Sequence, residues 1–333
     1  MPKILTSLKI KSMKTVGVIC GGFSSEYDIS LKSGTTILEN FPAEYKAVRI
    51  ILSKENTTVE WNGELFPIDL PTLTFQAKDG KHKIDYALIY IHGNPGENGK
   101  IQALFDINNI PYINSGALAS ELSFDKWYCN QFLRNFGIPV AKSCLLLRGE
   151  SWDAKKIVNN LGLPIFVKPC DSGSSYGISK VKAEEHLNEA IENAFKEGDS
   201  VVLESFLNGI EVTCGVYKSK DGLIALPLAE IVSENDFFDF EAKYLGQSQE
   251  IVPARIPHET TIKVQEISKK IYSILRLRSV SRVDFMIVDD VPHVIEVNTI
   301  PGFTSESIVP RMLKAENKSI TDFWKEIMEV EAI

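Results

Sequence analysis

The sequence contains no long apolar run and no excess of positive charge. Across 333 residues, no stretch approaches the roughly 18 consecutive apolar residues that a membrane-spanning helix requires. Lys and Arg total 36 against 44 for Asp and Glu, so the formal net charge is −8. Such a chain lacks the broad basic surface that binds nucleic acid or an anionic membrane, although a local basic cleft for a small anion stays open. We therefore expect neither nucleic acid nor a membrane as a partner.

The sequence also lacks paired cysteines and a secretion signal. Its five cysteines are scattered without a CxxC spacing and lie mostly in apolar segments, as reduced thiols do: Cys20, Cys129, Cys144, Cys170 and Cys214. No long apolar stretch ending in small residues opens the chain. These absences indicate a cytoplasmic protein. Residues 1–13 precede the first convincing strand and receive no function, as either an upstream start or a disordered leader.

Two common nucleotide motifs are missing. The string GxxxxGK[ST] does not occur, which excludes a P-loop NTPase. The first strand, 15–20, is followed by GGFSSE instead of GxGxxG, and the second, 47–52, is followed by Ser53-Lys54 with no acid for a ribose. A nicotinamide-dependent dehydrogenase is therefore disfavoured.

The pattern of elements predicts three domains. Alternating strands and helices up to about residue 115 indicate a parallel α/β domain. From 116 to 206, strands on either side of a Gly/Ser-rich loop indicate a small α+β domain, and 207–333 reads as a larger antiparallel domain. A serine-rich turn is expected before a helix at 124–136, and an ordered functional loop is expected over 233–254. Clefts between domains are preferred locations for small-molecule sites.

The predicted hairpin over 280–298 carries the most informative side chains. Alternation along a strand places Arg282, Asp284, Glu296 and Asn298 on one face and the apolar residues Val283, Phe285, Ile287, Ile295 and Val297 on the other. Buried charges are costly unless they are paired or bind a metal. Oxygen ligands that include a neutral Asn suit Mg²⁺. A structural face of ion pairs is the alternative.

The segment NTIPGFTSES (298–307) follows the hairpin directly. Backbone N–H groups at its Pro-Gly turn, or at a helix start near Ser307, can bind an oxyanion or a carboxylate. An ordinary turn and helix cap explains the same residues equally well.

A lysine and a flexible loop form a second candidate site. Lys168 ends an apolar strand, and the loop Cys170-Asp171-Ser172-Gly173-Ser174-Ser175 then reverses the chain into another strand. Backbone amides next to a lysine can hold phosphates, although most such loops are only turns. Lys126 is another candidate phosphate ligand, while lone helix lysines are usually solvated.

Two residues near the carboxyl ends of predicted parallel strands complete the candidates. Glu26 lies at the start of a helix, where it either compensates the helix dipole or holds an ammonium group. His92 ends the strand 86–91, at the edge of a sheet where ligands collect, although a lone histidine is more often structural.

Seven blocks together closely resemble the D-alanine–D-alanine ligases of the ATP-grasp superfamily. They occur in the family order and span nearly the whole chain: GGFSSEYDISLKSG (21–34), HGNPGENGKIQ (92–102), SGALASELSFDK (115–126), VKPCDSGSSYGISKV (167–181), FEAKY (240–244), SRVDFM (281–286) and EVNTIPGFTSES (296–307). The resemblance implies a three-domain ATP-grasp enzyme that joins two D-alanines through an acyl phosphate, for peptidoglycan precursors. It also implies ATP and two Mg²⁺ ions, replaceable by Mn²⁺, and a homodimer.

The resemblance assigns ligands for the metal and the nucleotide. Asp284, Glu296 and Asn298 would hold Mg²⁺. Phosphate contacts would come from Lys126, Lys168, Lys243, Ser174 and Ser175. The adenosine would lie against the connector between the central and C-terminal domains, at Glu204, Phe206, Leu207 and Glu211.

The resemblance also assigns substrate and catalytic roles. Glu26 would bind the ammonium of the first D-alanine with His92 nearby, while Ser307 and the amide of Ile308 would bind the carboxylate of the second. Arg282 and the amide of Gly302 would form the oxyanion hole. A set of Glu26, Ser174 and Tyr244 is linked to deprotonation of the second amine, and Tyr244 would close the 233–254 loop over the site.

Three departures from the family pattern bear on specificity. They are Cys170-Asp171-Ser172, Ile300 and Glu306, the last beside the carboxylate-binding Ser307. The EAKY block favours the dipeptide over the D-alanyl-D-lactate ester. An ATP-grasp ligase that uses D-lactate or another D-amino acid as second substrate is the alternative.

Overall fold

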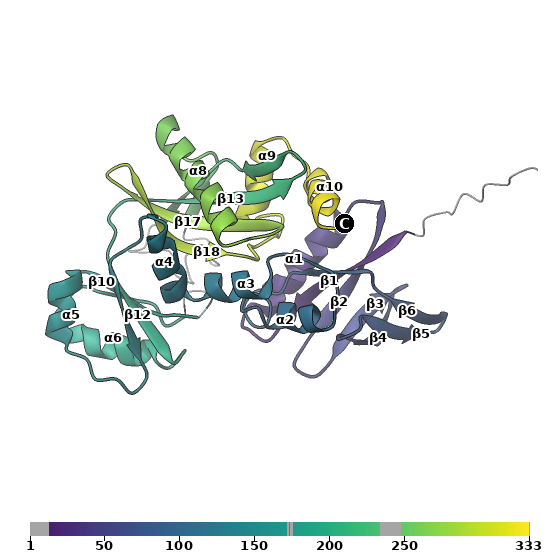
Figure 1. The fold of residues 1–333 in the computed structure, drawn as a ribbon, viewed down its shortest axis with the longest axis horizontal. Coiled ribbons are helices and arrows are strands. Elements are labelled where there is room, and N and C mark those ends of the chain that lie inside the picture. The colour runs from purple at the N-terminus through teal and green to yellow at the C-terminus, as the bar shows by residue number, and fades with distance from the viewer. Residues whose placement is uncertain (1–12, 172, 174–175, 234–247, 333) are drawn as a thin grey trace, which may run out of the picture.

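The computed structural model describes residues 13–332 except for 172, 174–175 and 234–247. Its described strands form three separate sheets of eight, four and six strands, which follow one another along the chain. Figure 1 shows the first sheet in purple and blue on the right, the second in teal on the left, and the third in green and yellow above them. Within the described ranges, none of the helices has the length and apolar character needed to cross a bilayer.

The first sheet is parallel in one half and antiparallel in the other. Its order is β6-β5-β4-β3-β2-β1-β7-β8, with parallel pairing among β2, β1, β7 and β8. The sequence predicts this parallel half correctly but gives no sign of the antiparallel extension from residue 57 to 83. The elements are β1 (Lys14–Gly21), α1 (Tyr27–Glu39), β2 (Tyr45–Leu52), β3 (Thr57–Trp61), β4 (Glu64–Asp69), β5 (Thr74–Ala77), β6 (Gly80–Lys83), β7 (Tyr86–Ile89), α2 (Lys100–Ile107) and β8 (Tyr112–Ile113).

The central sheet is antiparallel, with the order β11-β10-β12-β9. It closes a core of its own with two helices, built from residues between 146 and 203. The predicted strands on either side of the Gly/Ser-rich loop are confirmed. The elements are β9 (Ser143–Leu147), α5 (Ala154–Leu161), β10 (Ile165–Pro169), β11 (Ser179–Val181), the 3₁₀ turn η1 (Glu184–His186), α6 (Leu187–Ala194) and β12 (Ser200–Ser205).

The third sheet is also antiparallel, as predicted, with the order β16-β15-β13-β17-β18 and β14 paired to β13. One prediction here is wrong: residues 248–251 form strand β16 on β15, although the whole of 233–254 was expected to be a loop. The elements are β13 (Ile210–Ser219), β14 (Gly222–Ala225), β15 (Ala229–Ser233), β16 (Ser248–Ile251), α8 (His258–Ile274), β17 (Val280–Val288), β18 (Val291–Asn298), α9 (Ile308–Ala315) and α10 (Ile320–Glu331).

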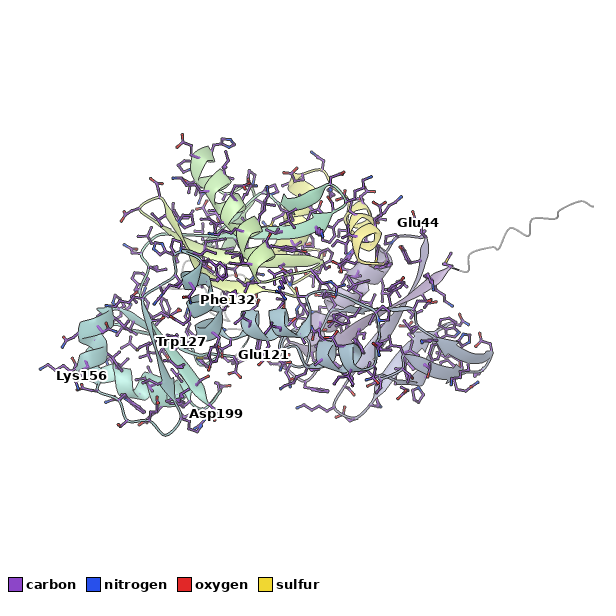
Figure 2. All side chains as sticks on the ribbon, viewed as in Figure 1. Glu44, Glu121, Trp127, Phe132, Lys156 and Asp199 are labelled. Carbon is purple, nitrogen blue, oxygen red and sulfur yellow. The ribbon has the colours of Figure 1, made fainter. Side chains whose placement is uncertain are left out.

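Two consecutive helices join the first sheet to the central one. The expected serine-rich turn before residue 124 is instead helix α3 (Ala117–Phe124), and α4 (Lys126–Asn135) follows after the single residue Asp125. Both helices pack against β18 and share a core with the third sheet. Figure 2 labels Glu121 on α3 and Trp127 and Phe132 on α4, between the central sheet and the rest of the molecule.

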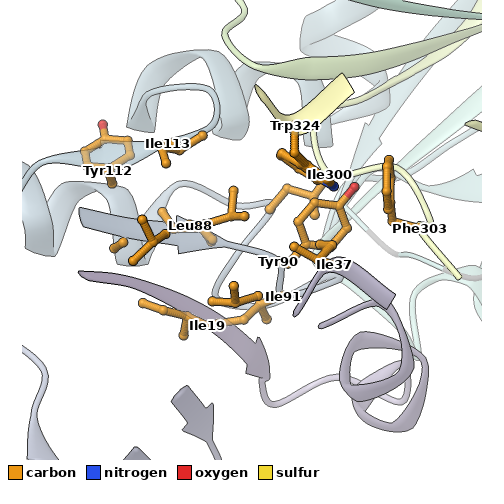
Figure 3. Packing of buried hydrophobic residues seen from close by; sticks show 14 of the residues in the cluster. Ile19, Ile37, Leu88, Tyr90, Ile91, Tyr112, Ile113, Ile300, Phe303 and Trp324 are labelled. Atoms are coloured by element: carbon orange, nitrogen blue, oxygen red, sulfur yellow. The ribbon is translucent and has the colours of Figure 1, made fainter. Parts of the chain in front are cut away.

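The first sheet and the C-terminal helices share one core (Figure 3). The Tyr90 ring lies 5.8 Å from Phe303 and 6.0 Å from Trp324 between ring centroids, and its hydroxyl donates to the Pro301 carbonyl at 2.9 Å. Phe303 in turn lies 5.1 Å from Trp324. The strands of the three sheets fall within the three predicted segments, and the domain limits at 115 and 206 stay a prediction.

Candidate active site

The hairpin of β17 and β18 brings the predicted polar residues together. In the register of the two strands, Arg282 faces Asn298 and Asp284 faces Glu296. A bulge follows Asp284, so that Phe285 pairs with Val294. The bulge shifts the alternation of β18, and Val294 is buried at 1% exposure while Ile295 is only partly buried. The prediction that Ile295 belongs to the core face is therefore wrong.

Asp284 is the centre of a hydrogen-bond network. Arg282 donates to both carboxylate oxygens, from Nε at 2.8 Å and from Nη2 at 2.7 Å. The Asn298 amide donates to Asp284 Oδ2 at 3.1 Å, and the Thr213 hydroxyl donates to Oδ1. Burial alone would lower the pKa of Arg282, but the charge and hydrogen bonds of Asp284 raise it above its ordinary value. The guanidinium therefore stays charged at any physiological pH.

The loop after β18 leads into a helix N-terminus. The Ser307 hydroxyl accepts a hydrogen bond from the Thr304 amide at 2.9 Å and lies 2.8 Å from the Thr304 hydroxyl. Ser307 is the N-cap residue of α9, so Ile308 begins the helix. A Cβ on Gly302 would lie 3.1 Å from Ser307 Oγ, which shows how close the two residues are. Backbone amides at such a helix start attract anions.

Glu26 and His92 form the N-terminal side of the site. Glu26 precedes α1, and a Cβ on Gly173 of the central loop would lie 3.0 Å from Glu26 Oε2. The His92 ring lies 3.0 Å from the Ile300 carbonyl through Nδ1 and 3.1 Å from the Ser33 hydroxyl through Nε2. A carbonyl only accepts, so Nδ1 carries the proton. Burial lowers the pKa of His92, and the ring is therefore neutral at pH 7.

The central sheet contributes a buried ion pair. Lys168 Nζ donates to Glu204 Oε2 at 2.7 Å, and the Asn130 amide donates to Oε1 at 2.9 Å. Burial alone would lower the pKa of Lys168, but the charge of Glu204 raises it above its ordinary value. Lys126 is also buried, and its backbone N–H donates to the Cys170 carbonyl at 2.9 Å. The Lys168 side chain is thus held by an ion pair, and Lys126 is anchored through its backbone.

The predicted adenosine residues lie at the junction of β12 and β13, with Glu204 on β12, Phe206 and Leu207 on the connector, and Glu211 on β13. The Phe206 ring lies 6.0 Å from that of Phe166, and Lys180 Nζ stands 4.1 Å from its centroid. Leu207 follows on the connector, and Glu211 pairs with Met286 on β17. These residues form a second group, separate from the cavity described next.

A cavity of about 400 Å³ gathers nine of the predicted residues. It takes lining from all three sheets or their loops. The predicted residues that line it are Glu26, His92, Lys126, Arg282, Glu296, Asn298, Gly302, Ser307 and Ile308. The predicted residues outside its lining are Lys168, Glu204, Phe206, Leu207, Glu211 and Asp284. Ser174, Ser175, Lys243 and Tyr244 lie outside the described residues.

The cavity also includes residues that sequence reasoning missed. Glu97 accepts a hydrogen bond from the Gly93 amide at 2.8 Å, and its pKa is raised to about 8 by burial and then by the charge of Glu26. Glu250 is bound by Arg311 Nη1 at 2.7 Å. Glu97 could have been predicted, because it is an acid within the glycine-rich turn after β7. Nothing in the sequence around Glu250 marks it as a site residue.

Comparisons with known proteins decide the family. The model described as D-ala D-ala ligase N-terminus matches residues 15–115, and that described as D-ala D-ala ligase C-terminus matches residues 132–329. The chain belongs to the D-alanine–D-alanine ligase family. The ligase of this name from Phocaeicola vulgatus is 40% identical over 319 residues, which cover 95% of this chain and 98% of that protein. The resemblance in the sequence is therefore confirmed.

Solved structures of the family share the whole architecture. The VanG D-Ala:D-Ser ligase from Enterococcus faecalis superposes with a TM-score of 0.87 at 32% identity and covers 96% of this chain and 100% of that one. A D-alanine–D-alanine ligase from Bacillus anthracis complexed with ATP gives 0.78 at 29% identity, covering 96% and 98%. The ATP-grasp fold is thereby confirmed.

Proposed function

We propose that this enzyme joins two D-alanines into D-alanyl-D-alanine with ATP, for peptidoglycan precursors. The observation that carries the proposal is one cavity that brings together Glu26, His92, Arg282, Gly302 and Ser307. Family membership and relatives named D-alanine–D-alanine ligase support the same reaction. We also propose a cytoplasmic location, which free cysteines support, and a homodimer, which rests on the resemblance alone.

The first step activates a carboxylate. The carboxylate of the first D-alanine attacks the γ-phosphorus of ATP, which forms an acyl phosphate and releases ADP. Glu26 holds the ammonium of this D-alanine beside the neutral His92. Lys126 and Lys168 offset the charge of the phosphates. Ser174, Ser175 and Lys243 remain proposed phosphate contacts, and Glu204, Phe206, Leu207 and Glu211 remain proposed adenosine contacts.

The second step forms the peptide bond. The amine of the second D-alanine attacks the acyl carbon, and the resulting tetrahedral oxyanion is stabilised by Arg282 and the amide of Gly302. Each such donor contributes about 3–4 kcal/mol in comparable enzymes. Ser307 and the amide of Ile308 hold the carboxylate of this D-alanine, and collapse of the intermediate releases phosphate. Ser174 and Tyr244 are the proposed partners of Glu26 in deprotonation.

The donor set on the hairpin fits Mg²⁺. Glu296 and the Asn298 side chain line the cavity and offer oxygen atoms, and Asp284 stands opposite Glu296 in the register. Among the described residues, no group of three or more His, Cys, Asp or Glu side chains is clustered for a metal. The proposed ions would be held by the carboxylates of Asp284 and Glu296 and by the carboxamide of Asn298. To bind a metal, Asp284 would give up one of the hydrogen bonds that it accepts here. Bound Mg²⁺, or Mn²⁺ in its place, neutralises charge on the phosphates.

The identity of the second substrate is the point to test. Glu306 lines the cavity next to Ser307, so a carboxylate lies beside the proposed carboxylate site. This carboxylate can change how the second substrate is held, so a ligase for D-lactate or another D-amino acid is the second candidate. ADP release should be measured with ATP, Mg²⁺ and D-alanine alone, L-alanine alone, or D-alanine with D-serine or D-lactate, with products identified by mass. D-Alanyl-D-alanine as the main product supports the proposal, whereas turnover only with another acceptor contradicts it.

A further inference from the structure

Glu97 is a second acid beside the proposed ammonium site. It lines the same cavity as Glu26 and is partly exposed. Its backbone N–H donates to the Gly93 carbonyl at 2.8 Å, and the Gly93 amide donates back to Glu97 Oε2 at 2.8 Å. This closed turn fixes the carboxyl group at the wall of the cavity. In the described ranges of the chain, no cation forms an ion pair with it.

Gly93 brings the two acids close to each other. A Cβ on Gly93 would lie 3.6 Å from Glu26 Oε2, and the amide of the same residue is bound by Glu97 Oε2. Both carboxyl groups are therefore neighbours of one residue in the loop after β7. Two carboxylates in such a place repel each other when both are charged, and a cation beside them removes the repulsion.

The charged groups around Glu97 do not supply that cation. Burial is the largest cause that raises the pKa of Glu97, to about 8, and the charges of Glu26 before α1 and Glu296 on β18 raise it further. Arg282 on β17 lowers this pKa, but its guanidinium is bound to Asp284. The carboxyl group of Glu97 therefore keeps its proton at pH 7 in the free protein.

The groups that precede and follow Glu97 along the chain do not supply the cation either. Burial raises the pKa of Tyr90 well above its ordinary value and lowers that of His92, so both are neutral at pH 7. Lys100 on α2 lines a neighbouring pocket that Glu97 does not line. A ligand that brings its own ammonium group therefore suits this part of the cavity.

We infer that Glu97 releases a proton when D-alanine binds, and that its carboxylate then shares the ammonium of the substrate with Glu26. The O–H bond of the Glu97 carboxyl group breaks, the proton passes to the solvent, and the ammonium keeps its own protons. The inference rests on the proposed function, because it requires that the cavity binds D-alanine. It adds a binding residue and a proton count to the first step.

The test is calorimetric titration of D-alanine into the protein, without nucleotide or metal, at pH 7 in phosphate and in Tris. The two buffers differ in ionisation enthalpy, so the difference in heat counts the protons released. Glu97→Gln removes the titrating group and keeps its shape. Glu306→Gln is the matched control, because it also removes one carboxylate from the lining of the cavity. D-Lactate, with a hydroxyl in place of the ammonium, tests the ligand in the parent protein.

We expect the parent and Glu306→Gln to release between about one half and one proton per D-alanine, because a nearby cation lowers the pKa of a carboxyl group by about 1–3. Glu97→Gln with D-alanine, and the parent with D-lactate, should release none. The Kd of D-alanine should fall about tenfold from pH 6 to pH 8 in the parent and stay constant in Glu97→Gln.

Equal proton release in the parent and in Glu97→Gln would overturn the inference, as would binding of D-alanine to the parent with no proton released. Equal release with D-lactate and D-alanine would also overturn it, and this comparison needs no variant. If the parent protein binds no D-alanine, the proposed function fails instead.

Discussion

The central sheet closes its own core, whereas the first and last parts of the chain share one. Buried residues between 146 and 203 form the core of the central sheet, together with helices α5 and α6. By contrast, Tyr90 of the first sheet packs on Phe303 and Trp324, more than 200 residues later. The proposed site has a half that would bind D-alanine and a half that would bind the phosphates of the nucleotide. These two halves are therefore held by different cores. Tyr90, next to His92 of the proposed D-alanine half, lies in the shared core, whereas Lys168 of the proposed phosphate half lies on the independent one.

The largest expected effect concerns the proposed metal ligands on the third sheet. Glu296→Ala should abolish ADP formation while the fold stays intact, because the proposed metal site loses a carboxylate that lines the cavity. ADP release measures the activity, and circular dichroism measures whether the fold is intact. Glu266→Ala, at an exposed pair with Lys269 on α8, is the control and should be fully active. Normal Mg²⁺ dependence in Glu296→Ala would rule out the metal assignment.

Substitutions in the two cores should separate the two halves. Trp324→Ala in the shared core and Ile191→Ala in the central core both remove fully buried side chains. The first should lower the free energy of unfolding by about 3–5 kcal/mol and the second by about 2–5 kcal/mol, measured in urea. Trp324→Ala should raise KM for D-alanine more than Kd for ADP, and Ile191→Ala the reverse. Equal changes in both variants would contradict the division.

The ion pair of the central sheet allows stability and binding to be separated. Lys168→Met should lower the free energy of unfolding by about 3–5 kcal/mol, because it leaves the Glu204 carboxylate buried without its cation. Adding Glu204→Gln removes that buried charge, so the double variant should recover most of the stability. Both variants lack the lysine, so ADP affinity should be low in both, as calorimetry can measure. Recovery of ADP binding in the double variant would show that Lys168 acts only through Glu204.

The last expected effect is a change in the pH dependence of stability. The pKa of Glu97 is raised to about 8 from its ordinary value of 4.5 by burial and by Glu26. The folded protein therefore keeps a proton that the unfolded chain releases between these pH values, and its stability falls as pH rises through that range. Glu97→Gln should match the parent near pH 5 and exceed it near pH 8 in urea unfolding. A constant difference at both pH values would show that Glu97 does not titrate in this range.

The sequence predicts the site residues on strands better than it predicts the helices next to the site. Alternation alone groups Arg282, Asp284, Glu296 and Asn298, because side chains on a regular strand have fixed faces. The same rule fails at Ile295, since a bulge leaves no mark in the residue types. The segment 117–124 was expected to be a turn because serine favours caps and turns, but packing on β18 stabilises a helix there.

Residues that act through distant contacts could not be predicted locally. Ser123 is one of two serines in α3, and only the folded chain shows that it lines the cavity. Glu250 is likewise paired with Arg311, 61 positions later. The roles assigned by resemblance to Ser174, Ser175, Lys243 and Tyr244 stay predictions. A single sequence shows which side chains are present, but not which of them the fold brings together.

The shared core also sets an order for the synthesis of this chain on the ribosome. The central sheet has all of its core residues once residue 203 has emerged, and it can close while the rest is still being made. The aromatic side of the first sheet around Tyr90 is not complete at that stage, because Phe303, Phe323 and Trp324 are translated more than 200 residues after Tyr90. A chain that stops before α10 would leave this apolar surface open, so the first sheet depends on helices that are made much later.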